Sequence, residues 1–233
     1  MTVQEQIYAY LQPFGGEETI QELAEQIAVN LPEIVLPSNP LLCRQLVEQY
    51  SYGTEEGKRR CAALLASAMN PKRANKLHPA FAKLPEQMSE QDWMILDGLV
   101  EQPLPVMDCV LCRVKKNGTG PLARETVTPV RELVPRLTML PPEHGDLIGL
   151  QVCYDNLLRL GLAELHMEDE YRDPASVQEE SYENIYLMHE DLIVQTEKNV
   201  CETLRPIGER CVRIRTGWFS ITAMGRRFVR FCR

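Results

Sequence analysis

The sequence lacks the features that mark membrane, secreted or nucleotide-binding proteins. No apolar stretch reaches the roughly 18 residues that a membrane span requires, and polar residues stand where a signal peptide would have its apolar core. There is no nucleophile elbow, no P-loop and no dinucleotide fingerprint. We therefore expect a cytoplasmic protein that is not an enzyme and that needs no cofactor.

Complete sets of metal ligands are also missing. Only Cys109 and Cys112, of eight cysteines, stand at the spacing of a zinc knuckle, and no second knuckle or histidine pair completes four ligands. The run around them alternates as a strand does, so a buried strand pair is the simpler interpretation. Residues 168–170 are acidic but lack the glycine and terminal glutamate of a calcium loop. We expect free thiols and no metal.

Charge is distributed unevenly along the chain. The 233 residues carry a net charge of −8 and are 44% hydrophobic, which fits one large or two small globular domains. Residues 57–85 hold seven basic residues and no acid, and residues 202–233 hold eight arginines against two acids. Residues 164–191 hold ten acids and one arginine. The net charge is therefore a poor guide to the partners of this protein.

Helical patterns dominate the first ninety residues. Apolar residues recur at helical spacing in residues 17–31, and further helices are predicted over residues 41–50 and 54–69, the last with Thr54 as N-cap. Ser89 followed by Asp92 resembles a capping box that opens another helix. The sequence predicts a mostly α fold of the α+β class, with a helical region at residues 1–88.

The remaining chain has the order of a winged-helix domain, which we place at residues 89–233. An amphipathic helix from Asp146 ends at Gly161, which permits the left-handed turn that leads into a strand at residues 162–165. A return strand at residues 211–221 leads into a helix capped by Thr222. The two strands would form a small β-wing. A long insert at residues 101–145 takes the place of the third helix, and within it residues 109–116 and 123–130 could pair as a hairpin.

Seven basic residues are candidates for contact with nucleic acid if the two basic stretches converge. In the return strand, alternation puts Arg213 and Arg215 on the face opposite Val212 and Ile214. The candidates are Arg213, Arg215, Arg226, Arg230, Arg233, Lys58 and Arg59. The alternatives are solvated faces or ion pairs with the acidic segment. Sequence-specific reading is disfavoured, because the helix before Gly161 carries only one basic residue, Arg159, beside Asp155.

One run of the sequence resembles a known family. The run from Glu55 contains Leu64, Leu65, Ala66, Ala68 and Met69; Asn70 and Pro71; His78, Pro79 and Phe81; and Met88, Ser89 and Asp92. It is similar to the signature block of the Abi-alpha (abortive infection alpha) family of bacterial and phage proteins. The likeness continues more loosely through Asn156, Leu157, Gly161 and Leu162 to Ile221, Thr222, Gly225 and Phe228. It implies a link to phage resistance but supplies no catalytic residues, and we interpret His78 as a turn or capping residue.

Three functional hypotheses follow. The first is a non-enzymatic interaction protein associated with phage defence, which acts through protein or nucleic-acid contacts. The second is a winged-helix DNA-binding regulator, and the third is a structural module that self-associates through its charged segments. We expect a protein partner or a second copy, with nucleic acid possible and no membrane.

Overall fold

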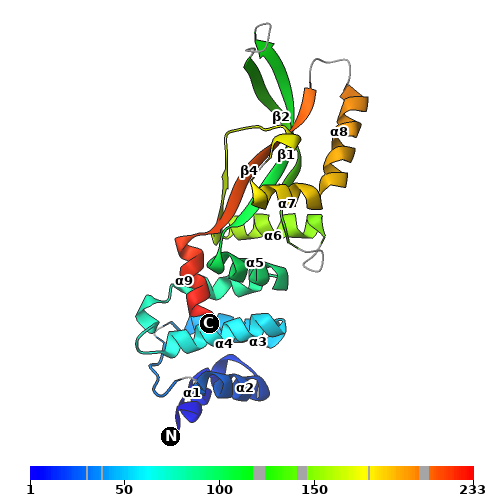
Figure 1. The fold of residues 1–233 in the computed structure, drawn as a ribbon. Coiled ribbons are helices and arrows are strands. Elements are labelled where there is room, and N and C mark those ends of the chain that lie inside the picture. The colour runs from blue at the N-terminus through cyan, green and yellow to red at the C-terminus, as the bar shows by residue number, and fades with distance from the viewer. Residues whose placement is uncertain (30, 38, 118–123, 141–145, 178, 205–209) are drawn as a thin grey trace. The chain divides into compact units, whose positions relative to one another are not determined.

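The computed structural model describes residues 1–233 except 30, 38, 118–123, 141–145, 178 and 205–209 (Figure 1). The fold is mostly helical and of the α+β class, as predicted. Contacts divide the chain into two compact units. The first consists of Met1–Val100, Cys153–Ala163 and Ile221–Arg233, and the second of Glu101–Val152 and Glu164–Ser220. The predicted domains, 1–88 and 89–233, stay a prediction.

The first unit is helical. Its elements are α1 (Val3–Leu11), α2 (Glu17–Ala28), α3 (Pro40–Tyr52), α4 (Glu55–Met69), α5 (Glu90–Glu101), the later turns of α6 (Leu147–Arg159), α9 (Ala223–Phe231) and the short 3-10 helices η1 (Gln12–Phe14), η2 (Ala74–Lys76), η3 (Pro79–Lys83) and η4 (Pro85–Gln87). The predicted cap of α4 is confirmed, because the Thr54 hydroxyl accepts a hydrogen bond from the Gly57 N–H at 3.2 Å.

The second unit is built on an antiparallel sheet whose strands lie in the order β2-β1-β4-β3. Its elements are β1 (Leu104–Asn117), β2 (Arg124–Leu137), β3 (Ala163–Met167), β4 (Arg210–Ile221), α7 (Glu180–Met188) and α8 (Glu190–Leu204), with the short η6 (Pro174–Ser176). Apolar side chains of β1 and β4 share a core with Tyr182, Ile185 and Ile193 of the two helices.

The predicted hairpin is confirmed and is longer than expected. Cys112 of β1 lies opposite Pro129 of β2 in an antiparallel register, and the pairing runs from Met107 to Asn117. Two prolines of this region, Pro129 and Pro135, lie in β2, which is an edge strand of the sheet. Proline is tolerated there because the open side of an edge strand has no partner that needs its N–H. Of the residues that join the two predicted strands, 117–122, the structure describes only Asn117.

The predicted order of helix, helix, strand, return strand and helix is present as α5, α6, β3, β4 and α9. The surroundings of the two wing strands differ from a minimal wing, because β4 also pairs with β1, and α7 and α8 separate β3 from β4 in the chain. The winged-helix likeness stays a prediction. Among the helices of the described chain, none is long and apolar enough to cross a bilayer.

Candidate interaction surface

Aromatic packing ties α9 to the middle of the first unit. Phe228 of α9 is fully buried, its ring centroid 5.3 Å from that of Phe81 in η3 and 5.4 Å from that of Trp93 in α5. Aromatic pairs of this kind stabilise the fold by more than the burial of their apolar area alone. Segments about 150 residues apart in the chain are thus held in one core, and the orientation of α9 is fixed.

His78 caps a helix. Its Nδ1 accepts a hydrogen bond from the Ala80 N–H at 3.2 Å, at the N-terminus of η3, and its ring lies 6.0 Å from that of Phe81. The predicted capping role is confirmed.

The box formed by Ser89 and Asp92 opens α5 and also holds α6. The Asp92 carboxylate accepts from the Ser89 N–H at 2.7 Å, and the Asp92 N–H donates to the Ser89 hydroxyl at 3.1 Å. Asn156 of α6 donates to the same carboxylate at 3.0 Å and to the Gln87 carbonyl at 2.7 Å. Residues that were only sequence signatures therefore meet in one hydrogen-bonded cluster.

The turn after α6 leads directly to α9. Gly161 has a φ of +69°, the left-handed conformation predicted for it. The next carbonyl, of Leu162, accepts from the Thr222 N–H at 3.0 Å, while the Thr222 hydroxyl caps α9 by accepting from the Gly225 N–H at 2.9 Å. Gly225 lies so close to the Leu162 carbonyl that a Cβ there would overlap it.

A comparison with protein families matches residues 15–232 to the family described as abortive infection alpha. The chain belongs to this family. Membership associates it with abortive infection, the property for which the family is named. No curated protein and no solved structure matches the chain. In this chain, residues that carry the likeness cap helices or pack the core of the first unit, among them His78, Ser89 and Phe228.

The predicted arginines of β4 are ion-paired. Val212 and Ile214 are buried in the core, as the alternation predicted, and the arginines point to the other face. There Arg213 lies 3.1 Å from Asp173 and 3.5 Å from Glu125, and Arg215 lies 3.5 Å from Asp108. For Arg213 one partner, Asp173, belongs to the acidic segment. A role in nucleic-acid contact stays a prediction for both arginines.

Asp108 makes the second unit sensitive to pH. Burial raises its pKa from 3.8 to about 6, with the Glu132 carboxyl adding to the rise; the Arg136 N–H and Arg215 act in the other direction. The folded chain thus holds this proton more tightly than the unfolded chain, so protonation of Asp108 adds to the free energy of unfolding. This contribution is complete below about pH 4 and is lost as the pH rises through about 6.

We expect Asp108→Asn to remove this decline in the free energy of unfolding, as measured by urea unfolding between these pH values. Glu125→Gln, at an exposed carboxylate, should keep it.

Three other predicted residues also have acidic partners. Lys58 lies 3.2 Å from Glu55, Arg59 lies 2.6 Å from Glu56, and Arg233 lies 3.1 Å from Asp97. Sequence reasoning missed the centre of this cluster, Arg60, which is 3% exposed and reaches both Glu56 and Asp97. The available signal was its place four residues after Glu56 and four before the buried Leu64.

The outer side of α9 carries arginines that lack such acidic partners among the described residues. Arg226 and Arg230, with Arg227, which sequence reasoning did not select, are exposed and form no ion pair with any described residue. Exposed cations also lie in residues 72–83, the segment that contains η3, and Phe81 packs this segment against α9. We call the three exposed arginines of α9, Arg226, Arg227 and Arg230, the basic surface.

The cysteines of β1 are parts of the sheet. Cys109 and Cys112 are buried, and burial raises the pKa of their thiols to about 12 and about 11. A raised pKa keeps a thiol neutral and poorly nucleophilic. Cys112 lies opposite Cys211 of β4. Within the described parts of the chain, no three His, Cys, Asp or Glu residues are grouped to hold a metal ion.

Proposed function

We propose that this protein acts in abortive infection as a non-enzymatic interaction protein, and that the basic surface contacts an anionic partner. The observation that carries the proposal is the exposure of Arg226, Arg227 and Arg230 without an acidic partner among the described residues. Several other arginines do have carboxylate partners, among them Arg213 and Arg60. Unmatched charge on one side of a fixed helix favours electrostatic association.

The partner is a protein with an acidic face or a nucleic acid. Guanidinium groups bind carboxylate and phosphate with the same two-pronged geometry, so both classes fit the basic surface. The exposed side of α6, the helix that ends before Gly161, carries Ile148, Val152 and Asp155 beside Arg159. Arg159 is itself bonded to Gln87 at 3.1 Å. This composition disfavours reading of base edges and supports sequence-independent or protein-directed contact.

Charge reversal on α9 should abolish the association. In Arg226→Glu with Arg230→Glu, repulsion replaces attraction at two adjacent positions, and we expect at least about a tenfold loss of the captured partner. The measurement is affinity purification from phage-infected and uninfected cells, with protein and nucleic acid identified separately. Phage plating on the same cells reports defence.

The matched control is Arg44→Glu with Lys198→Glu, which changes the net charge equally at exposed residues of α3 and α8. Capture and plating should then match those of the unaltered protein. The proposal fails if neither protein nor nucleic acid is captured and expression leaves plating unchanged. It also fails if both double variants lose the partner equally.

A further inference from the structure

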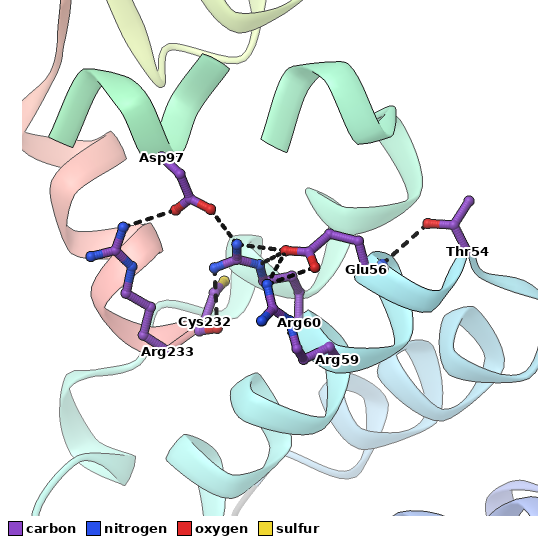
Figure 2. A network of polar contacts seen from close by, with 8 residues as sticks. Thr54, Glu56, Arg59, Arg60, Asp97, Cys232 and Arg233 are labelled. Carbon is purple, nitrogen blue, oxygen red and sulfur yellow. Dashed lines mark hydrogen bonds and ion pairs between the residues drawn. The ribbon is translucent and has the colours of Figure 1, made fainter. Parts of the chain in front are cut away.

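Three guanidinium groups and two carboxylates meet between α4, α5 and the C-terminal end of α9. Arg60 donates to Glu56 at 2.6 Å and also reaches Asp97 and, at 3.5 Å, the Cys232 carbonyl (Figure 2). Arg59 shares Glu56 with it, and Arg233 shares Asp97. The neighbouring cation Lys58 is matched by its own acid, Glu55. Counted over side chains alone, the cluster therefore holds three guanidinium groups and two carboxylates, one positive charge in excess.

A pocket of about 480 Å³ opens beside this cluster. Its lining combines the three arginines, Asp97, Cys232 and Gln26 with three alanines of α4, Ala62, Ala63 and Ala66. Cavities of this size accommodate small molecules. The Cys232 thiol adds no negative charge, because burial raises its pKa.

We propose that this pocket binds a small organic anion through Arg59 and Arg233. Arg60 is occupied by Glu56, Asp97 and the Cys232 carbonyl, whereas Arg59 and Arg233 each use one terminal nitrogen in the described contacts and stay partly exposed. The guanidinium has five N–H donors, so donors are left that a phosphate or carboxylate accepts. The alanine methyl groups provide an apolar wall for the body of the ligand. None of the residues of the basic surface lines this pocket.

Titration calorimetry tests the site. Inorganic pyrophosphate and citrate are the probes for phosphate and carboxylate chemistry, each titrated into the full chain at constant ionic strength. We expect saturable binding of at least one probe in the millimolar range or tighter, weakened about tenfold by Arg59→Gln or Arg233→Gln. Ala63→Leu, which fills the pocket without changing charge, should abolish binding.

Lys58→Gln is the matched control, since Lys58 neighbours Arg59 but does not line the pocket. It should bind the probe as the unaltered chain does, and so should Arg226→Glu with Arg230→Glu, which separates this proposal from the proposed function. Circular dichroism verifies that each variant is folded. The proposal is overturned if neither probe saturates below about 10 mM. It is equally overturned if Lys58→Gln weakens binding as much as Arg59→Gln, or if Ala63→Leu leaves binding unchanged.

Discussion

Replacing Arg60 by methionine should lower the free energy of unfolding by about 3 kcal/mol. The side chain is buried, connects Glu56 of α4 with Asp97 of α5, and lies 5.1 Å from the centre of the Trp93 ring. Methionine fills a similar volume but leaves two carboxylates with one partner less. The expected loss is at the low end for a buried pair, because Arg59 and Arg233 still neutralise these carboxylates in part.

Urea unfolding followed by circular dichroism measures this loss. Lys58→Met is the control, because it removes a cation from the same helix whose acid, Glu55, is exposed; such pairs contribute at most about 1 kcal/mol. Equal losses for the two variants would contradict a structural role for Arg60. A double variant with Asp97→Asn should lose less than the sum of its single variants, since the two residues are in contact.

Replacing Gly225 by alanine should cost about 2–3 kcal/mol, although alanine is the better helix former. The added methyl group would overlap the carbonyl oxygen of Leu162, which is backbone and which also accepts from the Thr222 N–H. Relief would require α9 to move from the residues that Phe228 packs against, namely Phe81 and Trp93. Thermal unfolding of the variant, compared with the unaltered chain, measures the effect.

Gly98→Ala is the matched control, in α5 of the same unit. A Cβ at Gly98 meets no atom within 4 Å, so the gain in helix propensity is uncompensated and we expect stabilisation of about 0.5–1 kcal/mol. Changes in stability of opposite sign for the two substitutions would show that contact with Leu162, and not helix propensity, decides the effect at Gly225. The same sign for both would refute this explanation of Gly225.

Local signals in the sequence predicted much of the fold. The caps at Thr54, Ser89 and Thr222 and the left-handed Gly161 are all confirmed. Each depends on residues within a few positions of one another, which is why sequence reasoning finds them. The hairpin was also predicted, but its length was not. The prolines of β2 are tolerated because β2 is an edge strand, and its position in the sheet is decided by the tertiary structure.

Contacts between distant segments could not be predicted in this way. The sequence contains Asp92 and Asn156, or Gly225 and Leu162, without any indication that they touch. Arg60 illustrates the same limit, since its burial depends on Asp97 and on the carbonyl of Cys232, 172 residues later in the chain. Pairing of this kind depends on how helices pack, and sequence spacing does not encode it.

The sequence by itself determined the family, the helical character and where the basic residues lie along the chain. Only the tertiary structure decided which of those residues keep an unmatched charge. Arg213 and Arg233 have carboxylates beside them, whereas Arg226 and Arg230 point outward from the side of α9 opposite Phe228. The physical reason is that a charge is neutralised by what lies within a few ångströms in space.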